Sequence, residues 1–352
     1  MIVGIPREIK AGERRVALLP EAVARLAADG HEVRVETQAG AGIDRGDGEY
    51  RDAGAAVGGT GDAWSADLVV KVKEIQKREL PRLAGGAAVF SFHHLAHESQ
   101  RTRELAGRHA SLIAFEELRD ANGDAPLLAP MSAIAGRMAI DVGARLLGRE
   151  LVHVLVLGAG HAGASAASAA AARGARVTIL TRSTRSRDAM AARGFDAAVA
   201  TPQAVERHAL EADLVVGAVF VPGQPTPTLL PRTLVSRMRR GACIVDISIE
   251  EGGVAETSRP TSHAQPTYVE EGVVHYCVGN MPAALPAESS EAISAAALPY
   301  VREMAARGVA RALREDTALR GALLMWKGRV AHPAIAAAAG LPYTALSELE
   351  PT

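Results

Sequence analysis

Cysteine is scarce in this 352-residue sequence, which has only Cys243 and Cys277. Both lie in apolar, strand-like runs, and neither has a second cysteine nearby, so zinc-site spacing is missing. We expect two buried free thiols rather than a disulfide, and no metal site. The formal net charge is -1, which excludes a general electrostatic attraction to nucleic acid or to an anionic membrane.

Long apolar runs are also missing. The opening MIVGIPREIK becomes charged too early for a signal peptide. The Ala-rich stretch 162–172 contains serines and falls short of the roughly 20 apolar residues that span a bilayer. We therefore expect a soluble, cytoplasmic protein that binds neither nucleic acid nor membrane.

Strand-like and helix-like segments alternate along the chain. The composition is ordinary for a globular protein, with 48% hydrophobic and 22% charged residues, and the length suggests two domains. Alternation of this kind predicts an α/β fold, with two Rossmann-like, doubly wound domains and a cleft between them. We expect a discontinuous substrate domain, 1–130 plus 299–352, and a dinucleotide-binding domain, 131–298. The predicted strands are 31–36, 67–73, 87–92, 111–115, 151–157, 175–181, 213–219, 242–247 and 275–278, and the clearest predicted helices are 21–28 and 132–147.

A glycine-rich turn follows the apolar run LVHVLVL and opens an Ala-rich helix. Its sequence, GAGHAG, matches the G-x-G-x-x-G pattern of dinucleotide-binding turns, and its position between a strand and a helix strengthens the match. The first glycine permits a tight turn, the second lets backbone approach a pyrophosphate, and the third allows close helix–strand packing. The predicted cofactor-binding residues of this turn are Gly158, Gly160, His161, Ala162 and Gly163.

The end of the next strand indicates which cofactor is bound. NAD enzymes normally carry an acidic residue there for the ribose hydroxyls, but this strand ends at Thr181 and continues RSTRSR. An arginine can hold a 2′-phosphate, so we favour NADP over NAD, with Thr181, Arg182 and Ser183 at the site. The alternative is a solvated, Arg-rich helix start with ordinary NAD binding.

Recognisable motifs are spread along nearly the whole chain. They are GIPREIKAGERRVALLP at the start, KVKE (71–74), SFHHLA (91–96), LAPMS (128–132), the glycine turn, VPG (221–223), VDISIEEGG (245–253), SRPT (258–261), YCVGNMP (276–282) and HPAIAAAAGLPYT near the end. In sequence and in order these motifs resemble alanine dehydrogenases and the related transhydrogenase α-subunits. The fold is a safer inference from this resemblance than the substrate.

The resemblance implies roles for matching residues. Arg15 is expected to hold a substrate carboxylate, which a guanidinium does with two parallel hydrogen bonds. Lys73 is expected to reach that carboxylate or the reacting carbonyl, and a histidine suits proton transfer near neutral pH. The remaining implied roles are Glu250 as a catalytic carboxylate, Met131, Asn280 and Met281 at the substrate, and Ser132, Val219, Val278 and Asn280 at the cofactor.

Because two histidines are consecutive, the residues alone leave open which of them is the catalytic acid/base. Neighbouring strand residues point to opposite faces, so one of His93 and His94 is expected to be structural. The resemblance puts the acid/base at His94, and His93 replaces a residue that is usually apolar. We further expect Arg15 and Lys73 to act from strand ends or loops, outside the core.

These features predict an oxidoreductase resembling L-alanine dehydrogenase. It would interconvert a small L-amino acid with its 2-oxo acid and ammonia, using NADP or NAD, as a homo-oligomer (hexamer or dimer). One alternative is a transhydrogenase-like hydride-transfer subunit, which Glu250 favours because alanine dehydrogenases carry Asp there. Another is a specialised 2-oxo acid or imine reductase of the same family with a substrate other than pyruvate. Glu288 and Glu291 flank a serine pair where relatives are less acidic, and such an acidic pair would select a substrate with an extra amine. The favoured interpretation of the two acids is a solvated helix start.

Overall fold

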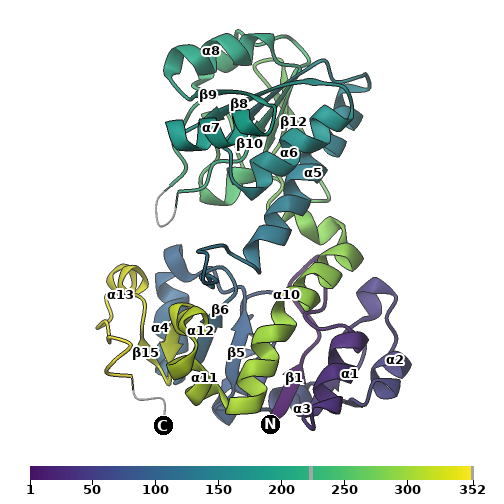
Figure 1. The fold of residues 1–352 in the computed structure, drawn as a ribbon, viewed down its shortest axis with the longest axis vertical. Coiled ribbons are helices and arrows are strands. Elements are labelled where there is room, and N and C mark those ends of the chain that lie inside the picture. The colour runs from purple at the N-terminus through teal and green to yellow at the C-terminus, as the bar shows by residue number, and fades with distance from the viewer. Residues whose placement is uncertain (222–224, 350–352) are drawn as a thin grey trace. The chain divides into compact units, whose positions relative to one another are not determined.

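The computed structural model describes residues 1–221 and 225–349, and it consists of two compact units (Figure 1). The discontinuous unit is Met1–Pro130 with Leu285–Thr352, and the inserted unit is Met131–Ala284. The division at residue 130 coincides with the predicted one. The chain returns to the discontinuous unit at residue 285 rather than at 299, because helix α10 (Pro286–Arg307) starts earlier than Pro299 suggested.

An eight-stranded sheet forms the centre of the discontinuous unit, in the order β15-β14-β6-β5-β4-β1-β2-β3. The strands β1 to β6 are parallel, whereas β14 pairs antiparallel with both β6 and β15. The parallel part starts in the middle and is built outward to both edges, as in doubly wound folds. The strands are β1 (Ile2–Ile5), β2 (Glu32–Glu36), β3 (Ala56–Gly58), β4 (Leu68–Val70), β5 (Ala88–Ser91), β6 (Ser111–Ala114), β14 (Leu323–Trp326) and β15 (Arg329–Val330).

Helices cover this sheet. Leu105 of α4, Val89 of β5 and Ile335 of α13 share one buried apolar cluster, and α10 runs alongside the sheet in Figure 1. The helices are α1 (Pro20–Ala28), α2 (Asp47–Asp52), α3 (Thr60–Trp64), α4 (Ser99–Gly107), α10, α11 (Val309–Glu315), α12 (Thr317–Gly321) and α13 (Pro333–Ala339), with short 3-10 turns η1 (Ala41–Ile43), η2 (Leu80–Gly85) and η3 (Leu95–His97).

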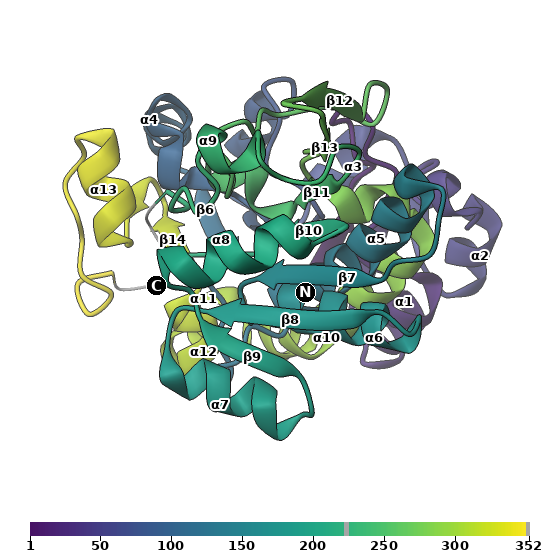
Figure 2. The same ribbon diagram turned by 90° about the horizontal axis from the view of Figure 1, so that it is seen from above.

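The inserted unit repeats this design around a seven-stranded sheet, β12-β13-β11-β10-β7-β8-β9. All strands are parallel except the edge strand β12, and Figure 2 shows β10, β7, β8 and β9 side by side. The strands are β7 (His153–Leu157), β8 (Arg176–Thr181), β9 (Asp196–Val199), β10 (Leu214–Gly217), β11 (Cys243–Asp246), β12 (Thr267–Glu270) and β13 (Val273–Tyr276). The helices are α5 (Leu128–Leu147), α6 (His161–Ala172), α7 (Thr184–Ala192), α8 (Pro202–Glu211) and α9 (Arg232–Val235), with 3-10 turns η4 (Ile247–Glu251) and η5 (Met281–Ala284).

Each sheet has one point where the winding direction reverses. It lies between β1 and β4 in the discontinuous unit and between β7 and β10 in the inserted unit. Ligands of open α/β sheets bind beyond the carboxyl ends of the strands at such a point. The segments that follow these strands are therefore the places to look for functional side chains.

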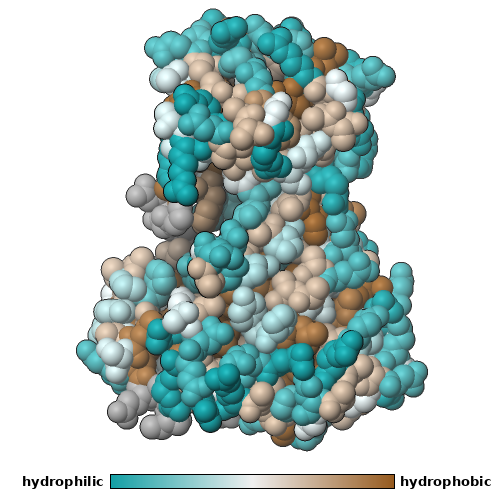
Figure 3. Space-filling view, viewed as in Figure 1, coloured by the Kyte–Doolittle hydropathy of each residue, from teal (hydrophilic) through white to brown (hydrophobic). Residues whose placement is uncertain are grey.

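The surface is mixed in character. On the face in Figure 3, hydrophobic residues form small patches between hydrophilic ones. Within the described residues, none of the helices is both long and apolar enough to cross a membrane. Cys243 and Cys277 are buried free thiols, as predicted.

Candidate active site

Arg15 lies in the segment that follows β1, and it forms a buried ion pair with Glu13. Its Nε donates to Oε1 of Glu13 at 2.7 Å and its Nη2 donates to Oε2 at 2.5 Å. The side chains of Arg15 and Glu13 are only 2% and 1% exposed. The expectation that Arg15 acts from outside the core is therefore wrong, because Glu13 neutralises the guanidinium and allows its burial.

Helix α10 holds the backbone of the segment that follows β1 and carries Arg15. The amide of Val16 donates to Oγ of Ser290 at 3.0 Å, and the amide of Leu19 donates to Oγ of Ser294 at 3.0 Å. Both serines are buried, while Glu288 and Glu291 of the same helix are exposed. Ser290, inside the acidic run, and Ser294, one helical turn later, therefore fix the loop that carries Arg15. The sequence motifs did not predict this role.

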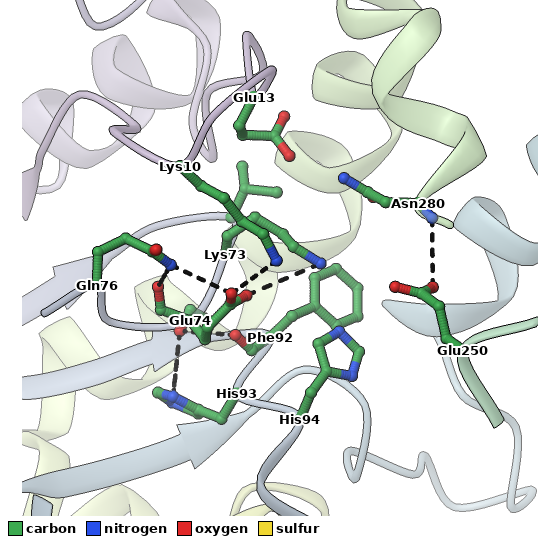
Figure 4. Close-up of polar contacts among 12 residues, drawn as sticks. Lys10, Glu13, Lys73, Glu74, Gln76, Phe92, His93, His94, Glu250 and Asn280 are labelled. Atoms are coloured by element: carbon green, nitrogen blue, oxygen red, sulfur yellow. Dashed lines mark hydrogen bonds and ion pairs between the residues drawn. The ribbon is translucent and has the colours of Figure 1, made fainter. Parts of the chain in front are cut away.

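Lys73 follows β4 and shares Glu74 with Lys10, and both amino groups point toward that carboxylate in Figure 4. Nζ of Lys10 lies 2.7 Å from Oε1 of Glu74, and Nζ of Lys73 lies 3.9 Å from Oε2. Burial opposes ionisation of Glu74, yet the two lysines lower its pKa to about 2. The side chain of Lys73 is 5% exposed, so it too lies deeper than expected.

A second buried lysine holds the Lys73 segment in place. Nζ of Lys71 lies 3.2 Å from a carboxylate oxygen of both Glu8 and Glu79, and it donates to the carbonyl oxygen of Lys73 at 3.0 Å. Glu8 also accepts from the backbone amide of Val72 at 2.6 Å. These paired charges tie the segment after β1 to the segment after β4.

The two histidines after β5 have different environments, and Figure 4 shows His94 beside Phe92 with His93 on the other side. His93 is buried, its Nε2 lies 3.2 Å from the carbonyl oxygen of Val89, and burial lowers its pKa to about 4. His94 is exposed and has left-handed backbone angles, with φ 50° and ψ 46°. Although part of His94 contacts solvent, its imidazole lies among Phe92 and other protein atoms. Desolvation of the ring and then the charge of Lys73 lower the pKa of His94, which favours a neutral imidazole.

The glycine turn of the inserted unit joins β7 to α6. Gly158 has φ +106°, and a Cβ there would lie 2.2 Å from the carbonyl oxygen of Ala218. A Cβ on Gly163 would lie 2.0 Å from the carbonyl oxygen of Gly158, whereas a Cβ on Gly160 would have no described atom within 4 Å. The first and third glycines are thus required by the fold, and the second leaves open space above the start of α6. This open cradle fits a pyrophosphate against the free amides of the helix.

Helix α5 packs against this turn. A Cβ on Gly136 would lie 2.0 Å from the carbonyl oxygen of Ala162, and Oγ of Ser165 donates to the carbonyl oxygen of Ala133 at 2.7 Å. His161 is exposed at the first position of α6. Nearer its N-terminus, α5 carries Met131, which is buried, and Ser132, which is half-buried.

The end of β8 presents arginines but no carboxylate. Thr181 is buried and its hydroxyl donates to the carbonyl oxygen of Ser183 at 2.8 Å, while Ser183 caps α7 by accepting from the amide of Ser186. Arg182 is exposed, and Arg187 pairs with Asp188 at 2.7 Å. The hydroxyl of Thr181 is thus engaged in a local hydrogen bond. Because Arg187 is paired with Asp188, Arg182 is the more available of these two arginines.

The segment after β10 is held by a serine that the sequence analysis did not single out. The backbone amide of Val219 donates to Oγ of Ser248 at 2.8 Å, and the amide of Ser248 donates to Oδ1 of Asp246 at 3.1 Å. Of the predicted motif 221–223, Pro222 and Gly223 lie outside the described residues.

Glu250 and Asn280 face each other (Figure 4). The amide of Asn280 donates to Oε2 of Glu250 at 3.3 Å, and a Cβ on Gly279 would lie 3.3 Å from the Glu250 carboxyl group. Val278 and Met281 on either side are buried. Glu250 thus lies along the backbone of Gly279 and Asn280.

In the part of the chain that the structure describes, no group of three His, Cys, Asp or Glu side chains could hold a metal ion. Glu116, directly after the predicted strand 111–115, accepts from the amides of His93 and His94. Its signal in the sequence, an acid directly after an apolar run, is too common to have been distinctive.

Comparison with known proteins gives consistent matches over the whole chain. The N-terminal domain model of the alanine dehydrogenase/PNT family matches residues 4–135, and the C-terminal domain model matches residues 135–333. An alanine dehydrogenase from Halomonas elongata is 39% identical, covering 99% of this chain and 100% of the relative. A solved L-alanine dehydrogenase matches with a TM-score of 0.91 and 39% identity over 96% of this chain and 99% of its own. A transhydrogenase from Sinorhizobium meliloti matches with a TM-score of 0.84 and 26% identity over 95% and 100%.

Proposed function

Because the chain belongs to the alanine dehydrogenase/PNT family, we propose that it is an amino-acid dehydrogenase that interconverts L-alanine, or a similarly small L-amino acid, with its 2-oxo acid and ammonia. The observation that carries this proposal is the grouping of Arg15, Lys73 and His94 after three strands of one sheet, β1, β4 and β5. A nucleotide-binding turn alone would fit many oxidoreductases, whereas these three groups fit a 2-amino acid.

The cations bind the substrate in this proposal. Arg15 takes the carboxylate in charge-assisted hydrogen bonds, and its pair with Glu13 holds the guanidinium in one orientation. Lys73, kept in place by Glu74, stabilises negative charge at the oxygen of the 2-oxo acid. Met131 and Met281 supply apolar contacts for a small side chain.

His94 moves the protons. Its lowered pKa keeps the imidazole neutral at physiological pH, so it accepts a proton during oxidation and returns it during reductive amination. Glu250 is the second proposed acid/base group, with Asn280 beside it. His93 is buried against the carbonyl of Val89 and serves packing rather than catalysis.

The inserted unit binds the nicotinamide dinucleotide, which supplies the redox chemistry when bound. Gly158, Gly160 and Gly163 with the start of α6 would hold the pyrophosphate, and Val219 and Val278 would contact the nicotinamide half. Ser132, His161 and Ala162 would complete the cradle. We propose a preference for NADP(H), because β8 ends without a carboxylate and exposed Arg182 can pair with a 2′-phosphate.

A transhydrogenase-like hydride-transfer subunit is the second candidate. The similarity to the Sinorhizobium meliloti transhydrogenase and the presence of Glu250 favour it. Such a subunit would pass hydride to a partner and would lack an organic substrate of its own. The intact set Arg15, Lys73 and His94 favours the dehydrogenase.

One assay separates these functions. NADPH or NADH oxidation is followed with ammonia and a panel of 2-oxo acids, beside a reaction in which each reduced cofactor meets the oxidised form of the other. Ammonia-dependent turnover of pyruvate supports the dehydrogenase, and turnover of a different 2-oxo acid redefines its substrate. Exchange between nucleotides without ammonia would instead support the transhydrogenase-like subunit.

Two smaller proposals rest on the family resemblance. The protein acts in the cytoplasm, and it assembles with copies of itself as a dimer or a hexamer. Light scattering after size exclusion measures the assembly directly.

A further inference from the structure

Glu116 lies at the end of β6, beside the end of β5. The two strands are parallel, with Ser91 opposite Ala114, and the amide of Phe115 donates to the carbonyl oxygen of Ser91 at 2.9 Å. The segments that follow the two strands therefore remain side by side. This register brings Glu116 next to His93 and His94, although they lie more than twenty residues apart in the sequence.

The carboxyl group of Glu116 accepts two successive backbone amides. Burial raises the pKa of Glu116 to about 7, and the amides of His94 and His93 oppose that rise by stabilising the ionised form. Its Oε1 lies 3.1 Å from the amide nitrogen of His93 and 2.7 Å from that of His94, and its Oε2 lies 3.2 Å from that of His93. Successive amides that converge on one anion form an anion-binding concavity of the backbone. In this protein a side chain of the same unit occupies that concavity.

His94 needs such support because its backbone is in the left-handed region, with φ 50° and ψ 46°. A residue other than glycine persists there only where the surrounding structure fixes it. The imidazole itself stacks on Phe92, with ring centroids 5.7 Å apart and planes 5° from parallel. Phe92 in turn packs edge-to-face on Phe115 at 5.2 Å. The two consecutive residues Phe115 and Glu116 thus hold the ring and the backbone of His94.

We propose that Glu116 is a positioning residue, which holds the imidazole of His94 in its working orientation by binding the backbone amides of His93 and His94. This inference rests on the proposed function, in which His94 is the acid/base. Glu116 acts through His94, whereas Arg15 and Lys73 bind the substrate. Loss of Glu116 therefore slows proton transfer and leaves the affinity for the substrate nearly unchanged.

Three variants of Glu116 separate the roles of its oxygen, its length and its charge. Glu116→Gln keeps an acceptor oxygen at the same distance, so we expect kcat to stay within about threefold. Glu116→Ala removes the acceptor, and we expect kcat to fall roughly tenfold or more with KM for L-alanine nearly constant. Glu116→Asp withdraws the oxygens by one methylene and should also lower kcat. Glu117→Gln, which removes the neighbouring charge, is the matched control and should behave like the unaltered protein.

A second readout does not depend on catalysis. The NMR signal of the His94 imidazole, identified by its loss in His94→Gln, should move in Glu116→Ala and in Glu116→Asp but remain in place in Glu116→Gln and Glu117→Gln. If Glu116→Ala does not fold, the Asp variant provides both measurements. The activity of the unaltered protein tests the proposed function separately. If that function is wrong, the unaltered protein lacks ammonia-dependent turnover, whatever the NMR result. An unmoved His94 signal in the Ala or Asp variant, or an unchanged kcat in an active protein, would overturn the role of Glu116.

Discussion

Glu13 and Arg15 are two residues apart in the chain, yet they form a buried ion pair whose side-chain hydrogen bonds measure 2.7 and 2.5 Å, and the backbone amide of Arg15 donates to Glu13 as well, at 3.0 Å. The pair means that the proposed carboxylate-binding cation already has a fixed position and a partner. Its charge is shared with Glu13, so removal of either partner affects folding as well as binding. Each partner must therefore be tested together with the other.

Arg15→Ala is expected to abolish activity and also to destabilise the protein. The variant breaks the buried ion pair with Glu13, and breaking a buried pair typically costs about 3–5 kcal/mol. The double variant Glu13→Gln with Arg15→Gln removes both charges, so it should recover much of the melting temperature while remaining inactive. Thermal melting and L-alanine kinetics provide the measurements. An Arg15→Ala protein with an unchanged melting temperature would contradict the buried pair.

His93→Leu is expected to flatten the pH dependence of stability without removing activity. Burial lowers the pKa of His93 from 6.5 to about 4, so between these values the unfolded chain binds a proton that the folded chain does not. Stability therefore decreases as the pH falls from 6.5 to about 4, and this group accounts for about 3 kcal/mol of the loss. Denaturant unfolding at pH 7.5 and at pH 5 (about one unit inside that window) measures the difference. Parallel pH curves for the two proteins would show that His93 is not the cause.

Arg182→Ala is expected to weaken NADPH binding by about tenfold and to leave NADH binding nearly unchanged. The reason is the loss of charge-assisted hydrogen bonds to the 2′-phosphate, which NADH lacks. Arg187→Ala is the matched control, because Arg187 already pairs with Asp188. Fluorescence titration with each cofactor provides the affinities. Tighter binding of NADH than of NADPH by the unaltered protein would refute the proposed preference.

Gly160→Ala and Gly163→Ala are expected to fail in different ways. At Gly163 the new Cβ would lie 2.0 Å from the carbonyl oxygen of Gly158, so the variant should lose stability. At Gly160 the new Cβ meets open space at an ordinary φ of -72°, so the variant should fold normally but bind the cofactor at least about tenfold more weakly. Melting curves and cofactor titrations distinguish the two outcomes. Equal melting temperatures for the two variants would mean that the turn can adjust.

The sequence predicted the parts of the fold that depend on local pattern. Residues 153–157 of the predicted strand 151–157 form β7, and the helix predicted at 132–147 forms most of α5. Pro299 misled the second boundary, because α10 continues through it and the packing of the whole helix outweighs one interior proline.

The site was predicted where the family motifs carry it, and missed where tertiary pairing decides. Nothing in the local sequence links Ser290 to Val16 or Glu116 to His94, since these contacts exist only after the elements have packed. The burial of Arg15 was missed for a related reason. A guanidinium is normally solvated, and nothing in the sequence marks Glu13 as the partner that permits its burial.

The pairing of β14 with β6 has a consequence for how the protein is made. Ile113 and Leu323 are partners in one sheet, with the whole inserted unit between them along the chain. A ribosome therefore releases every residue of the inserted unit before β6 can pair with β14. The contiguous nucleotide-binding unit can fold during synthesis, whereas the unit that begins first must finish last. Until then the edge of β6 is uncovered, and newly made chains are most exposed to mispairing and to chaperones in that interval.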